Sequence, residues 1–225
     1  MTSNTPIVKM NRSLVLRTVF VSALAAATVL TGTLTTAALR PAVAQAQAQG
    51  AGDFVESLGD RAIAVLADPK VTDEQAVEEF RRLLNENFDV TTIGRFVLGR
   101  YWNTASEAQR QEYMKLFERM IVEVYAQRFN QYAGETFEVT ASRADGTKDA
   151  IVSSQVLRPN GPPVKVDWRV RARDGGYRIV DVVVEGVSMS VTQRSEFASV
   201  IESNGGNIDA LLDALRKRAQ TAQAR

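Results

Sequence analysis

Neither cysteine nor histidine occurs anywhere in the 225 residues of this chain. Because cysteine is absent, no disulfide can stabilise the fold, and the hydrophobic core must do so alone. Ser-His-Asp and Cys-His nucleophile systems are excluded, and so are the usual zinc and copper sites. An enzyme of this composition would depend on carboxylates, Lys or Tyr. We therefore expect a protein without catalytic activity, metal or cofactor.

Acidic side chains are missing from residues 1–44, which contain four basic ones: Lys9, Arg12, Arg17 and Arg40. A run rich in Ala, Val, Leu and Thr covers residues 19–39, and Ala42-Val43-Ala44 forms a small-x-small site. This order predicts a secretory signal peptide that is cleaved after Ala44. The apolar run also has the length of an uncleaved membrane anchor, although threonines and Gly32 interrupt it.

Charge of one sign is not in large excess. The chain has 27 Lys and Arg against 26 Asp and Glu. Without residues 1–44, which carry four of the basic and none of the acidic side chains, the net charge is near −3. This charge gives no electrostatic argument for a nucleic-acid partner. An Ala, Gln and Gly-rich stretch at 45–52 predicts a flexible spacer, followed by one domain over residues 53–220.

Helical periodicity dominates the first half of that domain. Apolar residues recur at helical spacing in four segments, which begin near Phe54, Thr72, Val90 and Ser106. The first should end near Asp68-Pro69, the third just before Gly99, and the fourth, the longest, near Tyr132. Capping boxes of Thr72 with Gln75 and of Ser106 with Gln109 mark two of the starts, and Asp89 marks a third.

After Gly134 the apolar period becomes alternating. It predicts strands near 137–141, 150–157, 164–171 and 177–185, the last three as an antiparallel meander, and then two closing helices from Ser190 and Asn207. The third strand should have a wet face of four residues, Lys165, Asp167, Arg169 and Arg171. Segregated helices and strands predict an α+β fold in which helices pack over one face of a curved antiparallel sheet and enclose an apolar cavity. Composition alone fits a filled core as well.

The stretch from Tyr177 to Met189 is apolar on both faces, so an apolar layer should cover each. Asp181 and Glu185 in this stretch are the best candidates for a catalytic carboxylate pair. Spaced four apart on a strand, they would be about 13 Å from one another, beyond the range of glycosidase carboxylates. We expect Arg178 or Arg194 as their ionic partner, a turn at Gly186, and a helix cap at Ser188 or Ser190.

The chain resembles the MlaC family, also called toluene-tolerance proteins, over roughly residues 54–215. The resemblance rests above all on YRIVDVVVEGVSM at 177–189, with its Asp-x-x-x-Glu-Gly-Val-Ser pattern. Further matching residues are Phe88-Asp89, Leu98-Gly99-Arg100-Tyr101-Trp102, Tyr125, Arg194, Phe197, Gly205-Gly206 and Leu211.

This resemblance implies a periplasmic carrier that holds phospholipid acyl chains in an apolar cavity. Its partners would be an inner-membrane ABC transporter complex and an outer-membrane lipoprotein complex. Two alternatives stay open at this point. In the first, the protein is a carrier of a hopanoid or another polycyclic lipid, as in a related branch of the family. In the second, it is a non-catalytic periplasmic adaptor with a filled core.

The energetics of acyl chains agree with a carrier that needs no catalytic group. Burial of two chains of about sixteen carbons, at about 0.8 kcal/mol per methylene, is worth on the order of 25 kcal/mol relative to water. Release into water is therefore strongly opposed. Release into a second apolar site is feasible, because the gains at donor and acceptor nearly cancel.

The resemblance and the apolar periodicity together give candidate site residues. For lipid contact they are Phe96, Val97, Tyr101, Trp102, Phe117, Ile121, Val124, Tyr125, Val156, Trp168, Val184, Val187 and Met189. Among the apolar residues at the end of the last strand, Val184 and Met189 are favoured for the cavity. For partner docking, near the mouth of the cavity, the candidates are Arg100 and Arg194.

Overall fold

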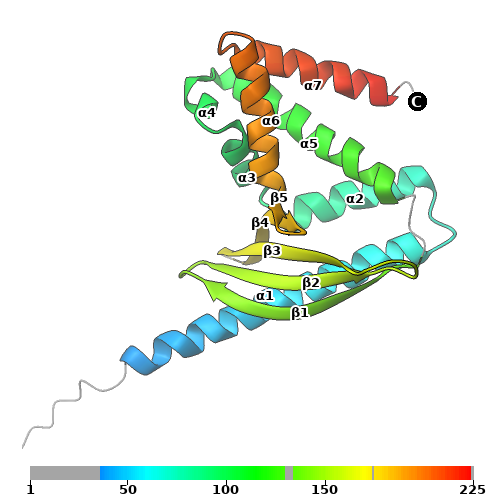
Figure 1. The fold of residues 1–225 in the computed structure, drawn as a ribbon, viewed down its shortest axis with the longest axis vertical. Helices are drawn as coiled ribbons and strands as arrows, with labels where there is room; N and C mark the ends of the chain where they lie inside the picture. Colours follow the sequence, from blue (N-terminus) through cyan, green and yellow to red (C-terminus); the bar gives the residue numbers. More distant parts are fainter. Residues whose placement is uncertain (1–35, 130–133, 174, 224–225) are drawn as a thin grey trace, which may run out of the picture. The chain divides into compact units, whose positions relative to one another are not determined.

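The computed structural model describes residues 36–129, 134–173 and 175–223 (Figure 1). Residues 1–35, most of the predicted signal peptide, lie outside the described residues. Within the described part of the chain, helices and one antiparallel sheet form separate layers, so the predicted α+β class is confirmed.

The first helix, α1 (Thr36–Ala67), includes the stretch at 45–52, so the flexible spacer predicted there is wrong. Ala48 and Ala51 are buried. A Cβ atom at Gly50 would lie 2.4 Å from the hydroxyl of Tyr177, which shows how closely the helix approaches the sheet. Small side chains permit this approach, and what resembles a low-complexity spacer in sequence is therefore a packing surface.

Four helices follow: α2 (Asp73–Asn87), α3 (Val90–Leu98), the short α4 (Tyr101–Thr104) and α5 (Glu107–Phe129). The predicted caps are confirmed, because Thr72 and Gln75 form a reciprocal capping box and the Asp89 carboxylate accepts from the Thr92 amide. Ser106 and Gln109 exchange the same pair of hydrogen bonds at the start of α5. The longest described helix, however, is α1.

The sheet contains β1 (Thr136–Asp145), β2 (Asp149–Leu157), β3 (Val164–Arg173), β4 (Gly176–Val184) and β5 (Val187–Ser188). Neighbours along the chain are neighbours in the sheet, and all pairs are antiparallel. The predicted meander is confirmed. It is extended by the two-residue strand β5, after which α6 (Met189–Ser203) and α7 (Ile208–Gln223) close the described chain.

Two separate apolar clusters hold these layers together. One joins α1 to a single face of the sheet through Val55, Val152, Val170 and Ile179. The other lies within the helices, where Phe117 and Phe197 pack edge to face. Because α3 and α6 also contact β4, helices approach the sheet from more than the one side that the sequence predicted (Figure 1).

The contact between α1 and β1 leads to a stability prediction. A Cβ atom at Gly59 would lie 2.2 Å from the ring of Phe137, which itself packs edge to face on Trp168. We expect Gly59→Ala to lower the free energy of unfolding by about 1–3 kcal/mol, because the ring must move. Gly52→Ala is the control in the same helix, because its Cβ would meet Ser142 at an ordinary 3.4 Å. Urea unfolding measures both, and equal effects of the two variants would contradict this packing.

Candidate functional site

Asp181 of β4 and Ser188 of β5 fix the start of α6. The Asp181 carboxylate accepts hydrogen bonds from the Ser188 hydroxyl (2.6 Å) and from the Ser190 amide (3.2 Å). The same Ser188 hydroxyl accepts from the Val191 amide and caps α6, as the sequence predicted. The expected ionic partner of Asp181, Arg178 or Arg194, is therefore wrong, because hydroxyl and amide donors of the β4–α6 connection occupy this carboxylate.

A two-residue turn joins β4 to β5. Glu185 and Gly186 have positive φ angles of 49° and 80°, between the paired residues Val184 and Val187. Positive φ at both central residues is the geometry of a tight hairpin turn, for which glycine is favoured. The strained Glu185 is held on both sides, since its amide donates to the Lys165 carbonyl and its carboxylate accepts from the Lys165 amide. A turn at Gly186 is confirmed, but it joins β4 to β5, whereas the sequence predicted a turn from strand to helix.

A pocket of about 620 Å³ lies where this junction meets α3 and the face of the sheet opposite α1. Apolar side chains from all three elements line it: Phe96 from α3, Ile151, Val180 and Val183 from the sheet, and Val191 from α6. Phe96 and Val191 are 42% and 51% exposed, unusually high for large apolar residues. The polar lining consists of Thr92, Arg143, Asp167, Arg169, Arg171, Asp181, Ser188 and Ser190.

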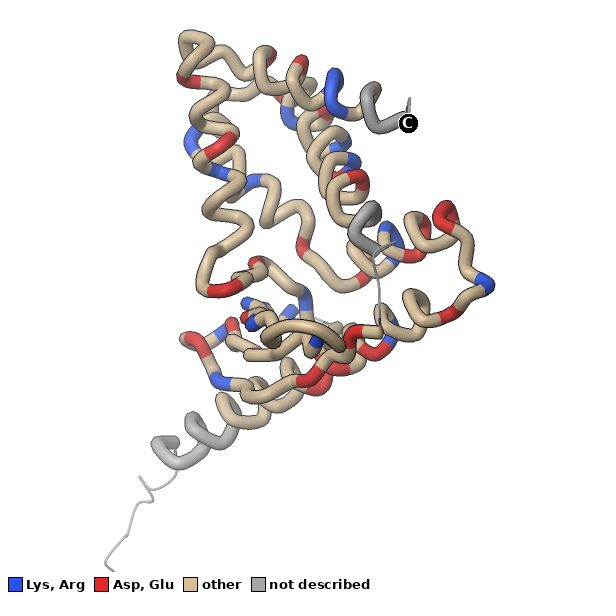
Figure 2. Tube along the Cα trace, turned by 45° about the vertical axis from the view of Figure 1, so that its right-hand side comes forward, with Lys and Arg blue, Asp and Glu red and all other residues tan. Residues whose placement is uncertain are grey.

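Basic and acidic residues lie close together in the strands that form this pocket (Figure 2). Arg171 makes two hydrogen bonds of 2.7 and 2.8 Å to the buried Asp149. Arg169 contacts Asp145 at 3.1 Å and Asp149 at 3.9 Å. The hydrogen bond from Arg171, helped by the nearby charges of Arg171 and Arg169, outweighs burial and lowers the pKa of Asp149.

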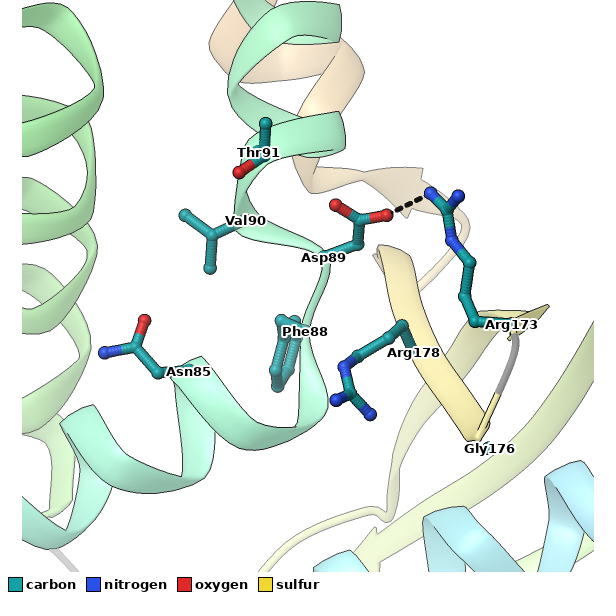
Figure 3. Close-up of a pocket in the computed structure, with 8 residues that line it drawn as sticks. All are labelled: Asn85, Phe88, Asp89, Val90, Thr91, Arg173, Gly176 and Arg178. Atoms are coloured by element: carbon teal, nitrogen blue, oxygen red, sulfur yellow. Dashed lines mark hydrogen bonds and ion pairs between the residues drawn. The ribbon is translucent and has the colours of Figure 1, made fainter. Parts of the chain in front are cut away.

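A second, smaller pocket of about 360 Å³ lies beside the link between α2 and α3 (Figure 3). Phe88 forms a parallel bridge with Ile179, and the Asp89 amide donates to the Ile179 carbonyl at 2.9 Å, so this link runs along β4. Figure 3 shows the Asp89 carboxylate directed at Arg173, with which it forms an ion pair. Burial opposes ionisation of Asp89, but hydrogen bonds from Thr92 and Arg173 outweigh it and lower its pKa.

The structure separates the predicted lipid-contact residues into different environments. Phe96 alone among them lines the 620 Å³ pocket. Val97 and Phe117 are buried in the helical cluster, against which four more of the predicted residues pack: Tyr101, Trp102, Ile121 and Val124. Trp102 has the guanidinium groups of Arg95 and Arg110 over its ring at 5.3 and 5.5 Å. Tyr125 and Met189 are half-buried.

Predicted residues in the sheet lie on the face that α1 covers. Trp168 packs in the α1 cluster and donates from Nε1 to the Ser154 hydroxyl at 2.9 Å. Val184 is paired with the buried Val166. Val156 lies two residues from Ser154 on β2 and therefore on the same face. Val187 in β5 is 52% exposed. Ile151, Val180 and Val183 line the pocket although the sequence pattern did not indicate them. Alternation along β3 does place Asp167, Arg169 and Arg171 on the opposite face. From the sequence, however, this face was predicted to contact solvent and not to line a pocket.

The two predicted docking residues lie at the α3–α6 contact. Arg100 forms an ion pair of 2.6 Å with Glu202 and a hydrogen bond to the Tyr101 hydroxyl. Arg194 lies over the ring of Phe96 at 5.1 Å, and its guanidinium approaches Gly99, whose φ is 59°. A Cβ atom at position 99 would crowd this side chain at 3.0 Å. Their role in docking stays a prediction.

No helix among residues 36–129, 134–173 and 175–223 is both long and apolar enough to cross a membrane. The same ranges contain no group of three or more Asp and Glu side chains arranged to hold a metal ion.

The Asp149–Arg171 pair predicts how stability depends on pH. Because the pKa of Asp149 is lowered on folding, its contribution is complete above the unfolded value of about 3.9 and is lost as pH falls through the folded value. We expect Asp149→Asn to lower the free energy of unfolding at pH 6 by about 1–3 kcal/mol. This deficit should shrink below about pH 4. Glu138→Gln, at an exposed position on β1, is the control; a deficit independent of pH, measured by urea unfolding, would contradict the pairing.

The family model "MlaC protein" matches residues 56–217. "Toluene tolerance protein ttg2D" of Pseudomonas putida is 25% identical over 137 residues, which are 60% of this chain and 64% of that protein. "Intermembrane phospholipid transport system binding protein MlaC" of Haemophilus influenzae is 26% identical over 130 residues, 56% of this chain and 60% of that protein. The chain thus spans less than two thirds of the length of these relatives.

A solved structure agrees with these matches. The phospholipid-binding protein from Ralstonia solanacearum, in complex with a phospholipid, superposes with a TM-score of 0.68 at 25% sequence identity. The superposition covers 77% of this chain and 98% of that one. Because the family model covers well over half of the chain, this protein belongs to the MlaC family.

Proposed function

We propose that this chain is a periplasmic phospholipid carrier that moves lipid between an outer-membrane lipoprotein complex and an inner-membrane ABC transporter complex without a chemical step. The observation that carries this proposal is its likeness to a Ralstonia solanacearum protein in complex with a phospholipid, over 98% of that chain. The name of the Haemophilus influenzae relative, an intermembrane phospholipid transport system binding protein, points the same way.

We place the mouth of the lipid site at the 620 Å³ pocket. Exposed Phe96 and Val191 flank it and would lose contact with water when an acyl chain enters. The hydroxyls and charges of the sheet face can remain near the polar part of the lipid. The direction of transfer would follow from the difference in lipid-binding free energy between the carrier and acceptor sites, because both sites bury the same acyl chains.

The direct test of the carrier is the fate of its lipid. Protein purified from the periplasm should contain extractable phospholipid by mass spectrometry and should retain it on long dilution, because release into water is opposed by acyl-chain burial. Mixing with the purified membrane complexes should accelerate transfer of intact labelled lipid. Equal loss of lipid without any partner would overturn the carrier, and cleaved lipid would favour an enzyme. A polycyclic lipid in the extract would favour the hopanoid alternative.

A charge at the mouth tests the position of the site. Val191→Glu adds a carboxylate to the pocket lining, while its exposure in the first turn of α6 should leave the fold intact. We expect at least a tenfold loss of bound lipid with unchanged circular dichroism. Ser199→Glu, at an exposed position farther along α6, is the control and should retain lipid.

A second pair of variants distinguishes the two faces of the sheet. Val183→Glu changes the pocket face, and Val184→Glu changes the face that α1 covers. Loss of lipid from the Val184 variant alone, with the fold retained, would place the cavity on the α1 side, as the sequence suggested, and would contradict our site.

Export predicts the start of the mature chain. Cleavage after Ala44 would fall within α1, and it would spare Gln47, whose carbonyl accepts from the Tyr177 hydroxyl at 3.3 Å, and the buried Ala48. The mature protein should therefore begin at Gln45 and keep both Gln47 and Ala48. N-terminal sequencing of exported protein checks this, and an intact segment of residues 1–44 in the membrane fraction would contradict it.

A further inference from the structure

Most charged groups that line the 620 Å³ pocket are already engaged. Arg171 is neutralised by Asp149 through two hydrogen bonds. Asp181 accepts from Ser188 and Ser190 at the start of α6. These groups hold the protein together and have little capacity left for a ligand.

Two charged side chains of the pocket lining, of opposite sign, are not engaged in this way. The side chains of Arg143 on β1 and Asp167 on β3 make no hydrogen bond or ion pair with any other residue in the described part of the chain. Arg143 is exposed and Asp167 half-buried. A carboxylate that faces a partly apolar pocket without a partner gains from a cationic hydrogen-bond donor, and a free guanidinium gains from an anionic acceptor.

The strand register places these groups on one face. Arg143 lies opposite Ile151, and Ile151 lies opposite Arg169, so the two arginines flank one apolar residue. Asp167 is two residues from Arg169 on β3, about 7 Å along the same face. Arg169 itself leans toward Asp145, away from Asp167, with its side chain 46% exposed. The pocket therefore has a basic side and, next to it, an acidic side.

A ligand that matches both sides carries a phosphate and a primary amine joined by a short linker. Guanidinium groups bind phosphate through paired hydrogen bonds, and a primary ammonium offers three donors to a carboxylate. A purely anionic headgroup would leave Asp167 facing negative charge. A choline headgroup has the positive charge but no N–H donor for the carboxylate.

We infer that the pocket selects phospholipids with a zwitterionic, primary-amine headgroup of the phosphoethanolamine class, with the phosphate at Arg143 and the ammonium at Asp167. This inference rests on the proposed function, because it concerns the headgroup of the lipid that the carrier holds.

The test is competition among headgroups with the acyl chains kept constant. Delipidated full-length mature protein is mixed with vesicles containing equal amounts of phosphatidylethanolamine, phosphatidylglycerol and phosphatidylcholine. Native mass spectrometry then measures which lipid is captured. We expect phosphatidylethanolamine to exceed each of the others about fivefold. Asp167→Asn should abolish this preference while total capture persists, and Glu138→Gln, which removes an exposed carboxylate outside the pocket lining, should preserve it.

Arg143→Gln tests the phosphate side. It should weaken capture of all three lipids to a similar degree, because phosphate is common to them, and Arg218→Gln at an exposed position on α7 is its control. Equal capture of the three lipids by the unaltered protein, preference for phosphatidylglycerol, or an unchanged preference in the Asp167 variant would overturn the headgroup inference while leaving the carrier intact. Capture of no lipid at all would overturn the proposed function itself.

Discussion

Packing of α1 on the sheet is the constraint from which the other features follow. Small side chains such as Ala51 let the helix backbone approach β1 and β2, and Val55 then fills the space against Val152 and Val170. A sheet has two faces, and this contact covers part of one of them. The 620 Å³ pocket lies on the opposite face, which carries both charged and apolar side chains.

The residues that carry the family resemblance mainly fix the conformation of the backbone. Asp181 ties β4 to the first turn of α6 through Ser188, and Asp89 caps α3 while its amide pairs with Ile179 of β4. These connections hold the N-terminal turns of two helices over one strand, which is where the pocket walls from α3 and α6 meet the sheet. The motif thus positions the walls of the pocket.

The sequence allowed the fold class, the caps and the meander to be predicted because each depends on residues a few positions apart. Thr72 with Gln75, or Gly186 after Glu185, determines local geometry without reference to the rest of the chain. Non-local features were harder. Trp168 belongs to a core because α1 covers its face of the sheet. The arginines and aspartate of β3 line a pocket only because α3 and α6 approach the other face. The prediction for residues 45–52 was wrong for the same reason. Their small side chains allow close packing against Tyr177, which is far away in the sequence.

The claim that lipid occupies the charged face of the sheet, under α3 and α6, is tested most directly by photo-crosslinking. Protein loaded with a phospholipid that carries a photoreactive group in one acyl chain is irradiated, digested and analysed by mass spectrometry. The account predicts crosslinks to peptides that contain Phe96, Val180 to Val183, and Val191. Crosslinks confined to α1 and to the Trp168 side of the sheet would contradict it.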